Sequence, residues 1–117
     1  MARMEKVDRQ LQKEISLIIQ RELADPRLQF VTITHAQVSK DLRNAKVSFS
    51  VMGTAQDIEK AQHGLERASG LIRKYVGQRM DMRYTPELFF VYDDSLERSA
   101  RIEATLKEIN NELKKNQ

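Results

Sequence analysis

The 117-residue chain contains no cysteine and no tryptophan, and only two prolines and four glycines. Without cysteine it can form neither disulfides nor thiolate-ligated metal sites. No apolar run approaches the roughly 20 residues that a membrane-spanning helix requires, and the first residues lack the apolar core of a signal peptide. We therefore expect a cytoplasmic protein whose residues 1–117 form a single domain, with its core over about residues 4–113.

Positive charge is concentrated in the middle of the chain, although the net charge is only +3. Between residues 67 and 83 the only acid is Asp81, whereas the basic residues are Arg67, Arg73, Lys74, Arg79 and Arg83. A concentrated basic patch is typical of a surface that binds phosphate groups of nucleic acid. The alternative is a solvated helix face, and charge alone favours that alternative.

The hydrophobic pattern of the first half predicts a helix followed by a hairpin. Apolar residues at helical spacing predict a helix over residues 4–24, which Asp25 and Pro26 end, leaving Arg27 as surface charge. The stretches 30–39 and 45–52 predict two antiparallel strands joined by a polar turn. On the second strand one face comprises Ala45, Val47, Phe49 and Val51.

A second long helix is predicted after Gly53, where Thr54 and Asp57 have the spacing of a capping box. Its apolar stripe continues in phase across Gly70, which favours a tight joint between two helices, or one kinked helix, over a loop. The stripe comprises Ile58, Ala61, Leu65, Ala68, Ile72 and Val76.

The last third of the chain predicts a strand and a helix. The apolar run at residues 87–92 is typical of a strand, and we expect it to be buried on both faces. A last helix opens at Asp94 or Ser95, with Ile102, Leu106, Ile109 and Leu113 on one side. The whole pattern predicts an α+β domain, with the helices, the C-terminal one included, packed on a three-stranded sheet.

Two glycines in the second long helix call for a reason, because glycine inside a helix costs roughly 1 kcal/mol relative to alanine. Opposite the buried stripe, the outward side carries His63, Arg67, Gly70, Lys74 and Gly77. If Ser69 capped a second helix, free N–H groups near Gly70 would attract phosphate, with Arg67, Arg73 and Lys74 around them. The alternative is that Gly70 only allows a bend.

Four stretches of the chain are shared with a known family: LQKEISLIIQRELADPRL, VSKDLRNAKVSFSV, ASGLIRKYVGQRMDMRYTPELFFVYDDSLE and RIEATLKEI. Together they resemble the bacterial ribosome-binding factor A family. The resemblance implies a type II KH-like fold of order α-β-β-α-kink-α-β. Ordinary KH domains clamp nucleic acid with a GxxG loop. This family has an AxG kink instead, which Ala68, Ser69 and Gly70 match.

The resemblance implies a monomeric assembly factor that binds the free small (30S) ribosomal subunit and its ribosomal RNA. Such a factor assists late maturation of the 5′ end of the 16S rRNA precursor, is linked to growth in the cold, and uses no cofactor, metal or small-molecule substrate. The residues that we predict to contact RNA are His63, Arg67, Ser69, Gly70, Arg73, Lys74, Gly77, Arg79 and Arg83.

Two other classes of function remain open from the residues. A protein-interaction module of α+β fold without RNA binding predicts weak salt dependence, whereas phosphate binding predicts a steep fall with salt. An enzyme would have to use His35, His63 or scattered carboxylates, and neither histidine has metal-ligand spacing. The sequence also lacks a glycine-rich phosphate loop, so we expect no catalysis.

Overall fold

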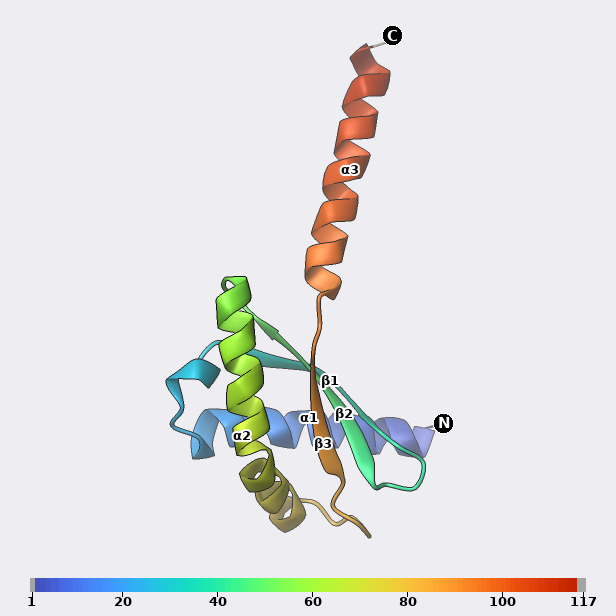
Figure 1. Cartoon of the computed structure of the whole chain (residues 1–117). Helices are drawn as coiled ribbons and strands as arrows, with labels where there is room; N and C mark the ends of the chain where they lie inside the picture. The colour runs from blue at the N-terminus through green and yellow to red at the C-terminus, as the bar shows by residue number, and fades with distance from the viewer. Residues whose placement is uncertain (1, 116–117) are drawn as a thin grey trace.

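The computed structural model describes residues 2–115, except for the side chains at positions 2, 3, 96 and 115. The elements are α1 (Ala2–Glu22), the short 3₁₀ helix η1 (Pro26–Leu28), β1 (Val31–Val38), β2 (Asn44–Val51), α2 (Ala55–Arg79), β3 (Glu87–Tyr92) and α3 (Ser95–Lys115) (Figure 1). The predicted order of elements and the α+β class are confirmed.

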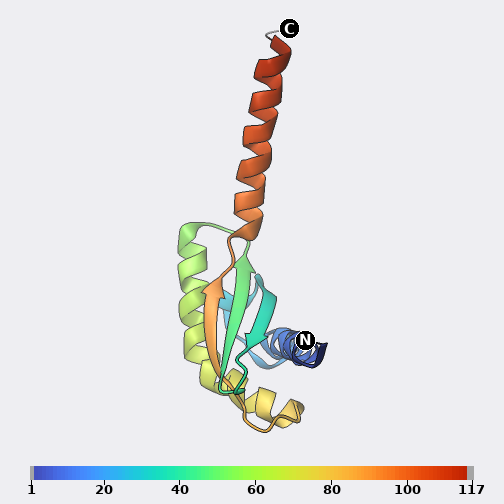
Figure 2. The same ribbon diagram turned by 90° about the vertical axis from the view of Figure 1, so that its right-hand side faces the viewer.

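The three strands form one sheet in the order β1-β2-β3 (Figure 2). β1 and β2 make the predicted antiparallel hairpin, with an irregularity in β1 between Ile33 and His35. β3 lies parallel to β2, because the chain crosses over through α2 before it returns to the sheet. The sequence pattern predicted three strands but did not give this order.

The core lies on the face of the sheet that α1 and α2 cover, with α1 against β1 and α2 against β3. The predicted inward face of β2 is confirmed, since Ala45, Val47 and Phe49 are fully buried. The predicted stripe of α2 is confirmed as well: Ala61, Leu65, Ile72 and Val76 are buried, and Ile58 and Ala68 are half-buried. Each large apolar side chain buried here contributes about 1.5–3 kcal/mol to folding.

Helix α1 ends at Glu22, two residues before the predicted end at residue 24. The reason lies in Asp25, whose carboxylate accepts the Arg27 backbone N–H at 2.9 Å and caps η1. The same carboxylate accepts from the Arg27 guanidinium, with Nη2 at 2.6 Å. Arg27 is therefore paired within its own turn, which agrees with its prediction as surface charge.

The expectation that β3 is buried on both faces is wrong. Leu88 and Phe90 point into the core, whereas Phe89 and Val91 on the other face are 49% and 42% exposed. No described helix covers that second face, because α1 and α2 share the first one. The unbroken apolar run at residues 87–92 therefore did not indicate that only one face of this strand is covered.

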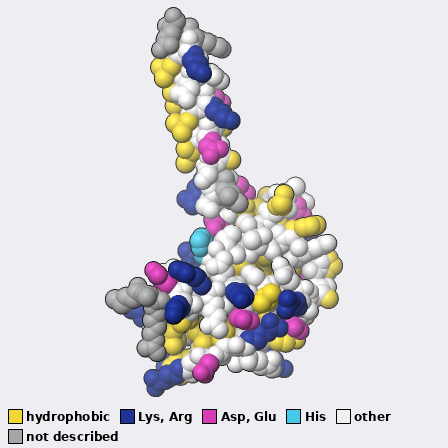
Figure 3. Space-filling view, turned by 180° about the vertical axis from the view of Figure 1, so that it is seen from behind, with side chains coloured by type: hydrophobic (Ala, Val, Ile, Leu, Met, Phe, Trp, Pro, Cys, Tyr) yellow, Lys and Arg dark blue, Asp and Glu magenta, His cyan; other side chains and the backbone are white. Residues whose placement is uncertain are grey.

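The expectation that the C-terminal helix packs on the sheet is also wrong. α3 extends away from the body (Figures 1 and 2), and the core ends near Tyr92. The predicted apolar stripe exists, as the yellow side chains along α3 in Figure 3 show, but it faces solvent. The exposed fractions are 61% for Ile102, 55% for Leu106, 47% for Ile109 and 59% for Leu113.

Hydrogen bonds at the end of β3 hold α3 in this direction. The Asp93 carboxylate accepts from the Ser95 backbone N–H at 2.9 Å and from Thr34 Oγ1 at 2.8 Å, so it joins β1 to the first turn of α3. The Tyr92 hydroxyl donates to the Glu97 carboxylate, which raises the pKa of Tyr92 to about 12. Among the described helices, α3 included, none is long and apolar enough to cross a membrane.

Candidate nucleic-acid interface

α2 carries most of the predicted RNA-contact residues and begins as its sequence predicts. Thr54 Oγ1 accepts the Asp57 backbone N–H at 3.3 Å, and the Asp57 carboxylate accepts the Thr54 backbone N–H at 2.8 Å. These bonds satisfy donors that the first helical turn leaves free, and the bonds from Thr54 lower the pKa of Asp57 below its ordinary value. The capping box is therefore confirmed.

α2 continues without a break in its hydrogen-bonding pattern from Ala55 to Arg79, and its ribbon changes direction partway along (Figure 2). This is the kinked-helix alternative, with the Ala68-Ser69-Gly70 segment inside the helix. Ser69 caps no second helix, because its hydroxyl donates to the Glu66 carbonyl at 2.8 Å. Since N–H groups within a helix bond to the preceding turn, the predicted seat of free N–H groups at Gly70 is wrong.

What the outward side of α2 offers instead is an open hollow beside the 80–86 loop, lined by Gly70, Arg73, Lys74, Gly77 and Thr85. We call it the α2 hollow. A Cβ built at Gly70 would meet no atom within 4 Å, so the backbone there is open to a ligand. A Cβ at Gly77 would lie 3.0 Å from Thr85 Oγ1, so Gly77 admits the close approach of the loop.

The two basic side chains that line the α2 hollow make different contacts. Arg73 donates to the Thr85 carbonyl from Nε at 3.2 Å and from Nη2 at 2.9 Å, and so fixes the loop against α2. Its guanidinium retains further N–H donors for an anion. Lys74 is exposed and forms no ion pair with any residue that the structure describes. Its charge is therefore fully available to a phosphate group.

His63 and Arg67 are exposed on the N-terminal half of α2. The Arg67 charge helps to lower the pKa of Asp25, although the hydrogen bond from Arg27 is the main cause. Arg67 is thus near enough to Asp25 for its charge to act on that carboxylate, and it lies on the same helix as the α2 hollow without lining it. Both residues extend the exposed polar side of α2 toward η1.

Arg79 does not line the α2 hollow, and its predicted contact with RNA stays a prediction. Its side chain is only 27% exposed and lies between two acids of α1, 2.9 Å from Glu22 and 3.7 Å from Glu14. The guanidinium therefore ties α2 to α1 and is already neutralised. The helical periodicity of α2 indicates that Arg79 points inward. The sequence does not indicate that Glu14 and Glu22 lie opposite it.

Arg83 is exposed, and its guanidinium carbon lies 5.5 Å from the centroid of the Tyr84 ring. Arg43, from the turn between β1 and β2, lies 5.6 Å from the same centroid. Sequence reasoning missed Arg43 and Thr85. The only sequence signal was the adjacency of Tyr84 to Arg83, since the turn and the loop come together only in the folded chain.

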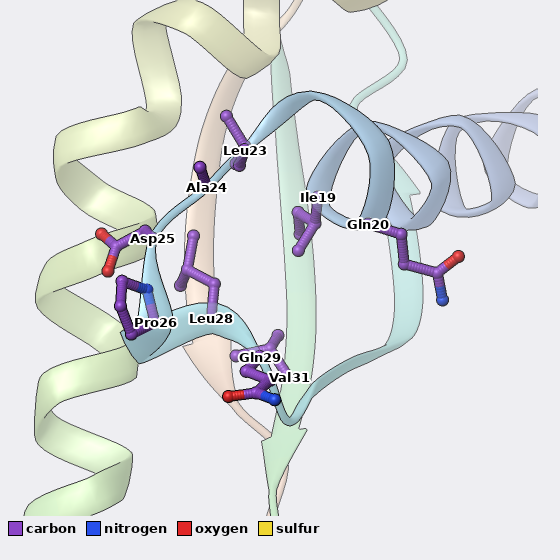
Figure 4. A pocket seen from close by; sticks show the side chains of 9 residues that line it. All are labelled: Ile19, Gln20, Leu23, Ala24, Asp25, Pro26, Leu28, Gln29 and Val31. Atoms are coloured by element: carbon purple, nitrogen blue, oxygen red, sulfur yellow. The ribbon is translucent and has the colours of Figure 1, made fainter.

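A further hollow lies where α1 meets η1 (Figure 4), lined by Ile19, Gln20, Leu23, Ala24, Asp25, Pro26, Leu28, Gln29 and Val31. No basic side chain lines it, and its carboxylate is bonded to Arg27. It therefore offers nothing to a phosphate group. Within residues 2–115, no group of three histidine or acidic side chains has the arrangement of a metal site.

Comparison with known proteins points to one family. The family model described as ribosome-binding factor A matches residues 3–106. A ribosome-binding factor A of Halothermothrix orenii is 51% identical over 102 residues, covering 87% of this chain and 84% of the relative. One of Acetivibrio thermocellus is 46% identical over 109 residues, covering 92% of this chain and 89% of the relative.

Solved structures agree with this match. The crystal structure of ribosome-binding factor A from Thermus thermophilus has a TM-score of 0.70 at 28% identity, over 76% of this chain and 94% of the other. A homology model of the Thermus thermophilus factor, fitted into the cryo-electron microscopy map of its 30S complex, has a TM-score of 0.62 at 29% identity. That match covers 74% of this chain and 91% of the other.

Proposed function

The chain belongs to the ribosome-binding factor A family, and we propose that it binds the free small ribosomal subunit as a non-catalytic assembly factor. The related factor of Thermus thermophilus has been fitted into a map of its 30S complex. In this chain the observation that carries the proposal is the α2 hollow, where open backbone at Gly70 lies beside the cations of Arg73 and Lys74.

The α2 hollow suits the sugar-phosphate backbone of ribosomal RNA. Because Gly70 has no side chain, the RNA backbone can approach α2 closely, and Lys74 then lies within reach of its phosphate groups. His63 and Arg67 extend the contact along the helix. Phosphate contacts of this kind give affinity and register, and the shape of the RNA supplies specificity.

In the finer form of the proposal, the bound monomer acts in the cytoplasm near the 5′ end of the 16S rRNA precursor. It holds one RNA segment in a single geometry while neighbouring segments fold or are trimmed. RNA helices become more stable at low temperature, so misfolded alternatives persist longer there. The need for a factor that favours one geometry is therefore greatest in the cold.

Co-sedimentation with purified small and large subunits over a salt series tests this proposal. Wild type should pellet with the small subunit and should be released steeply as salt rises, because each phosphate contact releases counterions. Arg67→Glu/Lys74→Glu should lose most of that binding. The matched control is Lys6→Glu/Lys13→Glu, which makes the same charge change at exposed positions of α1. If both variants pellet equally with the small subunit, α2 is not part of the interface.

A protein-interaction module without RNA binding is the second candidate, and the exposed apolar stripe of α3 favours it. An amphipathic helix with anchors at this spacing is typical of binding in a protein groove. This alternative predicts that salt and the α2 charges have little effect on binding, and that Leu106→Lys abolishes it. The same salt series therefore separates the two candidates.

A further inference from the structure

Two arginines from different parts of the chain lie near the ring of Tyr84. The guanidinium carbons of Arg43 and Arg83 are 5.6 Å and 5.5 Å from its ring centroid, within the range of cation–π attraction. The Tyr84 residue is 44% exposed. Two cations and an aromatic surface therefore meet at one place on the outside of the molecule.

Neither guanidinium is neutralised by an ion pair with a residue that the structure describes. Asp41 is one acid near Arg43: its carboxylate accepts the Arg43 backbone N–H at 3.1 Å, and the Arg43 charge is a minor cause of its lowered pKa. The main cause of that lowered pKa is a hydrogen bond from Ser39. Two like charges that lie near one ring and form no ion pair with a described residue give a positive potential that favours an anion.

Hydrogen bonds fix both sides of this cluster before any ligand arrives. On one side, the Arg43 carbonyl accepts the Glu87 backbone N–H at 2.8 Å, which holds the turn against the start of β3. On the other side, Arg73 holds the carbonyl of Thr85, the residue that follows Tyr84. A surface arranged in advance binds with a smaller loss of conformational entropy.

The cluster adjoins the α2 hollow, because Thr85 lines that hollow and is bonded to Tyr84 in the chain. We propose that Tyr84, Arg43 and Arg83 form a seat for one unpaired nucleotide of the RNA strand that the α2 hollow binds. The exposed ring and the guanidinium planes beside it offer surfaces on which a base stacks, and the two positive charges attract the phosphates next to that base. This inference rests on the proposed function, which it extends from phosphate contact to single-strand recognition.

A single strand fits this seat better than a duplex. The bases of a duplex are stacked on one another and present no free face to a side chain, whereas unpaired bases stack on aromatic rings and guanidinium planes. Stacking of this kind tolerates any base, so the seat selects for unpaired RNA and not for a sequence. The combination of one ring with flanking cations is the chemistry that non-specific single-strand binding uses.

Fluorescence anisotropy with labelled oligouridylate of about ten nucleotides, and with an RNA duplex of similar length, tests the seat. Tyr84→Ala should weaken single-strand binding roughly tenfold, a loss within the range for one stacked base, and should leave duplex binding nearly unchanged. Tyr84→Phe, which keeps the ring, should bind within about twofold of wild type. Arg43→Gln/Arg83→Gln should lower the slope of log affinity against log salt by about 1.4.

The outcomes separate this inference from the proposed function. If wild type does not pellet with the small subunit, the proposed function fails and the seat with it. If wild type pellets with the subunit but binds neither oligonucleotide, the seat alone is overturned. If Arg67→Glu/Lys74→Glu loses RNA binding while Tyr84→Ala binds the single strand as wild type does, the seat alone is overturned. Equal losses on single strand and duplex would also overturn it. Should Tyr84→Ala fail to melt cooperatively, the salt slope of the folded Arg43→Gln/Arg83→Gln variant decides.

Discussion

Arg73 donates two hydrogen bonds to the main-chain oxygen of Thr85, from Nε at 3.2 Å and from Nη2 at 2.9 Å. The residue therefore both shapes the α2 hollow and lends it charge. It also links the hollow to the Tyr84 cluster, because the loop that it holds carries Tyr84. Replacing Arg73 should therefore loosen the loop and also remove positive charge from the α2 hollow.

Arg73→Gln should lower the free energy of unfolding by about 1 kcal/mol, since a typical hydrogen bond contributes that much. The backbone amides of residues 81–85 should exchange faster with solvent than in wild type. Lys74→Gln removes the same charge without touching the loop and is the matched control. Urea unfolding and native-state hydrogen exchange measure the two effects. If the loop amides exchange equally fast in both variants, the hydrogen bonds from Arg73 do not hold the loop against α2.

Gly70→Ala and Gly77→Ala should have different consequences, although both replace a helical glycine. A Cβ at position 70 meets no atom within 4 Å, so Gly70→Ala should stabilise the protein by about 0.5–1 kcal/mol. It should also weaken binding to the small subunit, because the new methyl group stands on the contact surface. A thermal melt and the sedimentation assay measure the two quantities.

Gly77→Ala places its methyl group 3.0 Å from Thr85 Oγ1, so the loop must shift to admit it. Its stability should therefore rise by less than that of Gly70→Ala, or fall. A larger gain for Gly77→Ala than for Gly70→Ala would mean that the loop does not press on α2 as the structure shows.

Much of this fold was predictable because local rules act on neighbouring residues. The capping box at Thr54 and Asp57, the stripe of α2 and the alternation of β2 each depend on spacing within one element. The cluster around Tyr84 depends on where separate elements meet, as does the pairing of Arg79 with Glu22. Hydrophobic periodicity also indicates that a helix has an apolar side without indicating what covers it, which is why the placement of α3 was wrong.

The ion pairs of Arg79 lead to a prediction that separates stability from binding. Arg79→Gln should destabilise the protein by about 0.5–1 kcal/mol, because the pairs are partly shielded from water. It should leave the salt dependence of subunit binding unchanged. A double-mutant cycle with Glu22→Gln should show a coupling between the two side chains. A reduced salt slope for Arg79→Gln would instead show that Arg79 contacts RNA, as the sequence analysis predicts.

Asp93 gives the fold a dependence on pH. Hydrogen bonds from Ser95, backbone first, and then from Thr34 lower its pKa from 3.8 to about 2. A lowered folded-state pKa stabilises the fold above the unfolded value, and that stabilisation is lost as pH falls toward 2. The difference in unfolding free energy between wild type and Asp93→Asn should therefore shrink from pH 4 downward. Urea unfolding at a series of pH values measures it, with Asp94→Asn as the control.

Because α3 is exposed, we expect the part of the chain before α3 to fold without help from the apolar stripe of α3. Leu106→Lys/Ile109→Lys should leave the urea midpoint of the body unchanged within error, because both side chains lie in solvent. By contrast, Leu65→Ala, at a fully buried position of α2, should cost about 2–5 kcal/mol. Amides of α3 should also exchange faster than those of α2, since a helix without tertiary contacts is only marginally stable in water. A large loss of stability in the double-lysine variant would mean that α3 packs against the body in solution.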